Sequence, residues 1–136
     1  MFDLSQISWL GVAVATVASF ALGGVWFTAL FGRAYSTALG RAHDPSAKPP
    51  MLMIAGPAVW SLVTAVVMAL LMTALGIETM GSAIGFGLLV GLGLLAATSA
   101  NTGINPNIPK PLLYGAISGT YHLTAGLVIA TLLVLL

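Results

Sequence analysis

The chain has 136 residues, of which 59% are hydrophobic and 5% are charged, and its formal net charge is +1. Soluble domains are about one quarter charged, so four cationic and three acidic side chains are too few to cover a water-facing surface, and the main solvent must be lipid. The sequence has no basic patch to bind nucleic acid, and no cysteine for a disulfide, a reactive thiol or a cysteine metal site.

Four long apolar segments predict an all-α protein that crosses the membrane several times. The segments cover about residues 6–32, 51–76, 81–101 and 111–136. Each has about 20 or more residues, the length that a hydrocarbon core about 30 Å thick requires of a helix. The apolar runs are continuous rather than alternating, which favours helices over a membrane barrel. We therefore expect a single domain, residues 1–136, that forms an antiparallel bundle of four transmembrane helices in a lipid bilayer.

The charged residues predict how this bundle lies in the membrane. The loop between the first two segments contains Arg33, Arg41 and Lys48, and the loop between the last two contains Lys110. The opposite side has Asp3 and Glu78 and no lysine or arginine. Because cytoplasmic loops are enriched in lysine and arginine, both loops should lie in the cytoplasm and both termini outside.

The two cytoplasmic loops differ in character. Residues 33–39 are amphipathic and predict a short helix in the headgroup layer, whereas residues 40–50 predict a mobile linker in which His43 is solvated. The loop 102–110 is rich in asparagine and proline, which favours a rigid capped turn over a polar mouth of a cavity. Asn101 precedes it, either as a helix C-cap or as a ligand-binding amide. Pro57 either begins the second helix or kinks it.

Small residues at four-residue spacing predict where the helices touch, because close backbone approach drives helix association in lipid. These helix-packing residues are Gly11, Ala15, Ser19 and Gly23 in the first segment, Gly87 and Gly91 in the third, and Gly115 and Gly119 in the fourth. The third segment has glycines on more than one face, which predicts a central position. The stripes exceed what one four-helix bundle needs, so we expect a homo-oligomer.

His122 lies near the middle of the last segment, and an ionisable side chain at that depth is a functional-site hypothesis. Counting from the cytoplasmic edge places Trp60, Ser61 and Thr64 at the same depth. Three interpretations stay open. His122 is a neutral imidazole bonded to another helix, or a group that handles a substrate or proton in a cavity, or a metal or haem ligand shared between two copies of the chain. Trp26 fits either an interfacial belt or this site.

Motifs of an enzyme are missing from the sequence. No transmembrane segment contains a pair of carboxylates, and no nucleophile elbow, zinc-protease or phosphate-binding motif occurs. We therefore predict no catalytic residue, no resident metal and no cofactor.

Two stretches resemble a known family. The residues that carry the resemblance are Gly23, Trp26, Phe27, Phe31 and Gly32 in the first helix and Tyr121, His122 and Leu123 in the last. They resemble the small bacterial four-helix membrane proteins catalogued as domain of unknown function 1761. The resemblance implies a four-helix, multi-pass protein of the bacterial inner membrane, and it implies no activity. In such a membrane the outer side, where the charge pattern predicts both termini, is the periplasm.

The sequence thus predicts a small protein for transport, permeation or binding of an unknown small molecule. The candidate ligand-binding residues are His122, Trp26, Trp60, Ser61, Thr64, Tyr121 and Asn101. The alternative is a non-catalytic structural or assembly protein that packs against other membrane proteins through its small-residue stripes.

Overall fold

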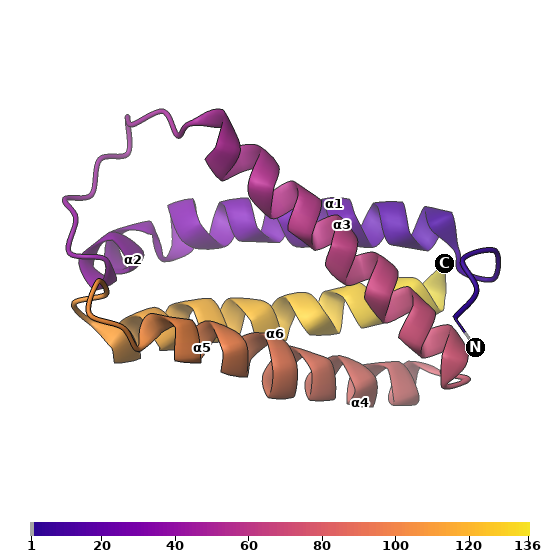
Figure 1. The fold of residues 1–136 in the computed structure, drawn as a ribbon. Helices are drawn as coiled ribbons and strands as arrows, with labels where there is room; N and C mark the ends of the chain where they lie inside the picture. The colour runs from indigo at the N-terminus through magenta and orange to yellow at the C-terminus, as the bar shows by residue number, and fades with distance from the viewer. Residues whose placement is uncertain (1) are drawn as a thin grey trace.

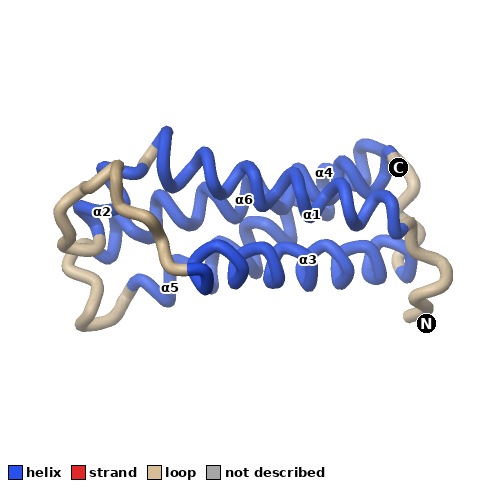
Figure 2. Tube along the Cα trace, turned by 90° about the horizontal axis from the view of Figure 1, so that it is seen from above, coloured by secondary structure: helices blue, strands red, loops and turns tan. Residues whose placement is uncertain are grey.

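The computed structural model describes residues 2–136, and all regular structure in this range is helical (Figure 1). Four helical spans are long and apolar enough to cross a membrane, which confirms the predicted fold class. The first span, Trp9–Leu30, is formed by α1 (Trp9–Val25) and the π-helical η1 (Trp26–Leu30), and the second is α3 (Met51–Ala74). The third span, Met80–Gly103, is formed by α4 (Met80–Val90), the π-helical η2 (Gly91–Ala96) and α5 (Ala97–Gly103). The fourth span is α6 (Pro111–Leu135). Successive spans run in opposite directions, as Figure 2 also shows.

The two ends of the bundle differ in charge. Both chain termini lie at one end, called here the terminal end (Figure 1). The opposite end, called here the basic end, holds the loops with Arg33, Arg41, Lys48 and Lys110. This separation of charge is the one that the sequence predicts.

The first span begins three residues later than predicted because Ser8 caps it. The Ser8 Oγ accepts a hydrogen bond from the Gly11 N–H at 3.0 Å, which satisfies one of the free donors at the helix start. At the other end the span breaks at Phe31, where φ is −121°. The short helix α2 (Gly32–Ala38) follows, in the place of the predicted amphipathic helix.

The structure excludes one of the alternatives left open for each of two residues near helix ends. α3 begins at Met51, so Pro57 lies within it and does not begin it. The third span continues to Gly103, so Asn101 is in its last turn and is not a C-cap. The Asn101 carbonyl accepts the N–H of Ile104 at 3.0 Å, and this bond closes the final turn.

α6 is the central helix, and the prediction that the third span is central was wrong. α6 contacts α1, α2, α3 and every part of the third span. The third span meets α6 through Gly87, Gly91 and Gly103, while its other three glycines face open space. These open glycines are Gly81, Gly85 and Gly93. Glycines on several faces therefore do not indicate several neighbours here.

The contact between α6 and the third span is a contact of backbones. A Cβ atom on Gly126 would lie 2.7 Å from the Gly91 Cα and 3.1 Å from the Gly87 carbonyl oxygen. A Cβ on Gly91 would lie 2.9 Å from the Leu123 carbonyl oxygen. No larger residue fits between these helices without moving one of them. Such close packing is what stabilises helix pairs in lipid.

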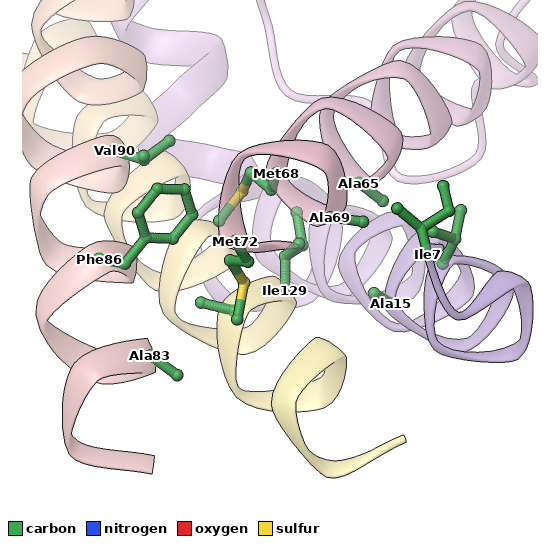
Figure 3. Close-up of a cluster of buried hydrophobic side chains, with 12 residues drawn as sticks. Ile7, Ala15, Ala65, Met68, Ala69, Met72, Ala83, Phe86, Val90 and Ile129 are labelled. Carbon is green, nitrogen blue, oxygen red and sulfur yellow. The ribbon is translucent and has the colours of Figure 1, made fainter. Parts of the chain in front are cut away.

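α3 lies diagonally across the other helices (Figure 1). It packs chiefly on α1 and less on α6, and it diverges from the third span after the short connection 75–79. Toward the terminal end, its Met68 and Met72 are buried against Phe86 and Ile129 (Figure 3). Toward the basic end its first turns are exposed, with Leu52 80% accessible. The divergence leaves space beside α6 in that half of the bundle.

The two loops at the basic end are joined to each other. The Lys110 N–H donates to the Ala38 carbonyl at 3.3 Å. Gly40 has a φ of +67°, a conformation that favours glycine, and a Cβ there would lie 2.9 Å from Pro109. Within the second loop, Asn105 Nδ2 donates to the Thr102 carbonyl at 2.6 Å. These bonds form the rigid capped turn that the sequence favours.

The backbone contact at Gly126 makes a testable prediction. Gly126→Ala should destabilise the fold by about 1–3 kcal/mol, because the added Cβ forces α6 away from the third span. Gly85→Ala is the matched control, since nothing lies within 4 Å of a Cβ there, and it should be neutral or slightly stabilising. Unfolding in mixed detergent micelles measures both, and equal effects of the two variants would contradict the packing described above.

Candidate functional site

A cavity of about 140 Å³ lies between α3 and the other spans at the level of His122. Its walls come from α1, α3, η2 and α6. The lining residues are Ser19, Pro57, Trp60, Ser61, Thr64, Leu95, Tyr121, His122, Ala125 and Ile129. Five of the seven predicted ligand-binding residues are thus brought together here, from two spans that are distant in the sequence.

His122 forms a hydrogen bond within its own helix. Its Nδ1 lies 2.9 Å from the Ser118 carbonyl oxygen. A carbonyl oxygen only accepts, so Nδ1 carries the hydrogen, and Nε2 of the neutral ring is left with a free lone pair. This differs from the expected bond to another helix, because no hydrogen bond joins the His122 side chain to another span within residues 2–136.

The free Nε2 atom is reachable. No buried side-chain nitrogen or oxygen in the described part of the chain lacks a hydrogen-bond partner. The His122 Nε2 has no partner, so it is not a buried atom, although the ring as a whole is half-buried. Because His122 lines the cavity, its lone pair is available to a molecule there.

Tyr121 joins α6 to α1 beside this histidine. Its hydroxyl donates to the Ser19 carbonyl at 3.1 Å. Gly23 makes room for the phenol, since a Cβ on Gly23 would lie 3.0 Å from the Tyr121 Oη. The Tyr121 ring also packs edge-on against the His122 ring, with centroids 4.9 Å apart. The small-residue stripe of the first span therefore accommodates a tyrosine and does not only allow two backbones to approach.

Trp26 and Asn101 do not line the cavity. The Trp26 Nε1–H donates to the Ile117 carbonyl at 3.1 Å, and its ring packs on Tyr121 with centroids 6.2 Å apart. Trp26 therefore links the first and fourth spans and is not part of the cavity wall. Asn101 is exposed near the basic end, away from His122.

Both π-helical segments lie against the part of α6 around His122. η1 carries Trp26 and Phe27, and Phe27 packs on Tyr121 with centroids 5.1 Å apart. η2 carries Leu95, which lines the cavity. A π-turn inserts an extra residue and redirects the side chains, and such turns are frequent at functional sites. Sequence patterns assume a regular period, so they miss these turns.

A row of aromatic rings connects the cavity with the basic end. From Tyr114 it passes through Tyr35, Phe27 and Tyr121 to His122, with successive centroid distances of 5.8, 4.7, 5.1 and 4.9 Å. This row was missed in the sequence because its members come from α6, α2 and η1. Within the row, the Tyr121 ring is packed between Phe27 and His122.

His43 lies apart from this row and from the cavity. Its Nδ1 is 3.4 Å from the Ser36 Oγ, and a Cβ on Gly32 would lie 3.2 Å from the imidazole Cε1. The exposed ring therefore rests on α2.

A second hollow of about 490 Å³ is an open groove between the third span and α6. Small residues form most of it. The lining residues are Leu92, Ala96, Ala97, Ala100, Gly115, Ala116, Gly119, Thr120 and Leu123. Of the predicted packing glycines, Gly115 and Gly119 lie here in ordinary contact with Ala100 and Ala96.

A family model described as "Protein of unknown function (DUF1761)" matches residues 10–134, which is nearly the whole chain. The chain belongs to this family. The match includes all four spans and the His122 cavity, and it confirms the resemblance seen in the sequence. No curated protein and no solved structure matches the chain. The family brings no assigned activity, so the function has to be argued from the site.

Tyr35, in α2 at the basic end of the aromatic row, predicts a pH effect on stability. Burial, and next the neighbouring Tyr114, raise the pKa of Tyr35 from 10.0 to about 12. The unfolded chain therefore loses this proton at lower pH than the folded chain, so the contribution of Tyr35 to stability is complete below pH 10 and is lost as the pH rises to about 12. Unfolding followed from pH 9 to 12 should show this loss, and Tyr35→Phe should reduce it. An unchanged slope in the variant would contradict the assignment.

Proposed function

We propose that this protein is a small transport, permeation or ligand-binding protein of the bacterial inner membrane, with its site in the His122 cavity. The observation that carries the proposal is the free, accessible Nε2 of His122 in a cavity between spans. The basic end would face the cytoplasm and both termini the periplasm, because four cationic side chains lie on one side.

The depth of His122 supports a functional role. It lies eleven residues after Pro111, so it is about 17 Å along α6 and close to the middle of a hydrocarbon core about 30 Å thick. Ionisable side chains at this depth are costly, and those that occur face a bundle interior or a water-filled cavity. His122 faces such a cavity, and substrate sites of transporters are typically found at this level between helices.

The wall formed by α3 supports exchange of a ligand. α3 holds Trp60, Ser61 and Thr64 against the cavity, where Ser61 meets the Tyr121 hydroxyl, and it packs on the bundle chiefly toward its other end. The loop before it, residues 41–50, is exposed throughout. A wall held by packing at one end moves more easily than one held by hydrogen bonds along its length.

Because the chain has no cysteine, a single introduced thiol tests whether water reaches the cavity. Ser61→Cys should react with a positively charged, water-soluble methanethiosulfonate at least about tenfold faster than Val63→Cys, since only a hydrated thiol ionises and reacts. Val63 is the matched control: it lies two residues away on α3, is 42% accessible and does not line the cavity. Equally slow labelling of both variants would overturn the proposed site.

The open groove favours a second candidate function, a structural or assembly protein. Six of its nine lining residues are glycine or alanine, so the backbone of another transmembrane helix can approach closely. The proposed occupant is a helix from a second copy of this chain, consistent with the expected homo-oligomer.

Filling the groove tests this candidate. Ala97→Phe should weaken self-association by at least about tenfold, because the ring occupies the space for the incoming helix. Leu89→Phe is the control, since Leu89 is 74% accessible on the same span and outside the groove. Sedimentation of the purified protein in detergent gives the oligomeric state. A monomeric wild-type protein, or equal loss in both variants, would exclude assembly through the groove.

A further inference from the structure

The polar side chains of the His122 cavity direct their hydrogens to backbone carbonyls. The Thr64 hydroxyl donates to the Trp60 carbonyl at 2.9 Å, and the Tyr121 hydroxyl donates to the Ser19 carbonyl at 3.1 Å. The His122 Nδ1 donates to the Ser118 carbonyl at 2.9 Å. Carbonyl oxygens only accept hydrogen bonds, so the hydrogens of these three groups are already used.

What these groups retain for a ligand is therefore lone pairs. The Thr64 Oγ1, the Tyr121 Oη and the His122 Nε2 each keep at least one acceptor site. The Ser61 hydroxyl lies beside the Tyr121 hydroxyl and, as a hydroxyl, can donate or accept a hydrogen bond. The cavity is thus rich in acceptors, which suits a ligand that carries several N–H donors.

The charges around the cavity favour a cation over an anion. No lysine or arginine is among the lining residues, since all four lie at the basic end. Two aromatic residues are among the lining residues, the half-buried Tyr121 and Trp60, which is 68% accessible, and the face of an aromatic ring attracts an ammonium group within about 6 Å. An anion would meet lone pairs and ring faces and would gain no countercharge.

We propose that the His122 cavity selects a small ammonium group, either free ammonium or a primary alkylammonium. The proposal rests on the proposed function, because it names the ligand class of that same site. A primary ammonium group has three N–H donors for the three acceptor atoms and a positive charge for the two rings. The cavity of about 140 Å³ is far larger than the about 10–15 Å³ that holds one water molecule, so methylammonium has ample room.

The absence of a carboxylate among the lining residues determines how strong this binding is. The acidic residues Asp3, Asp44 and Glu78 all lie outside the four spans. Neutral acceptors replace the hydration of a cation without holding it tightly, which suits passage more than storage. We therefore expect millimolar affinity.

The chain contains only two histidines, which gives a direct probe of the site. The experiment follows the imidazole Cε1 signals by NMR in nanodiscs at fixed pH and ionic strength, with His43→Gln to assign them. Methylammonium chloride should shift the His122 signal saturably. Tetramethylammonium chloride, which has the charge but no N–H, and potassium chloride should act at least tenfold more weakly. Acetamide tests a neutral donor, and sodium acetate tests an anion.

Two threonines provide matched variants for this titration. Thr64→Val removes a cavity acceptor and should weaken methylammonium binding about tenfold, the effect of losing one hydrogen bond. Thr102→Val removes an equivalent hydroxyl, which also donates to the carbonyl four residues earlier, at an exposed position outside the cavity. That variant should bind like the wild type, and an unshifted ligand-free His122 signal shows that each variant keeps its fold.

The outcomes separate this inference from the proposed function. If tetramethylammonium or potassium acts as strongly as methylammonium, or if Thr64→Val binds normally, selection by N–H donors is wrong. If acetamide or acetate shifts His122 and methylammonium does not, the cavity binds a small molecule of another class, and only the ammonium proposal fails. If no probe shifts His122, the proposed function fails as well.

Discussion

The arrangement of this bundle depends on the contact between the backbones of α6 and the third span. Lipid is as apolar as the helices, so the helices associate by close approach rather than by hydrophobic burial. At Gly126, Gly91 and Gly87 the approach is so close that a single Cβ would overlap the facing backbone. α6 therefore has a fixed distance to the third span, and the other helices arrange themselves around this pair.

The interhelical hydrogen bonds act on one side of this pair. The side chains of Tyr121 and Trp26 each donate to a carbonyl of the facing helix, and both bonds join α6 to the first span. Hydrogen bonds of this kind contribute about 0.6 kcal/mol on average in membranes, so they orient helices more than they hold them. α3 packs on the bundle mainly toward the terminal end, and leaves the His122 cavity where it diverges. The cavity is thus a consequence of how unevenly the four spans are attached.

Much of the fold and part of the site could be predicted from the sequence. The four spans follow from run length, and regular helical rise places Trp60, Ser61 and Thr64 level with His122, where the cavity brings them together. The central helix could not be predicted, because nothing in the sequence distinguishes Gly85, which faces open space, from Gly87, which faces α6. Other features depend on the neighbouring helices and leave no pattern in one sequence. These features are the direction of each hydrogen bond, the two π-turns and the contact of Trp26 with α6.

A third hollow bears on how a ligand would reach the His122 cavity. It has about 240 Å³, lies at the terminal end and is lined on α3 by Ala69 and Met72 and next to it by Glu78. Ile129, which lines the His122 cavity, and Met68 are both almost completely buried in the apolar cluster (Figure 3). Under the proposed function, a cation would therefore approach the His122 cavity more favourably from the end with Glu78 than from the basic end, which holds all four lysine and arginine side chains.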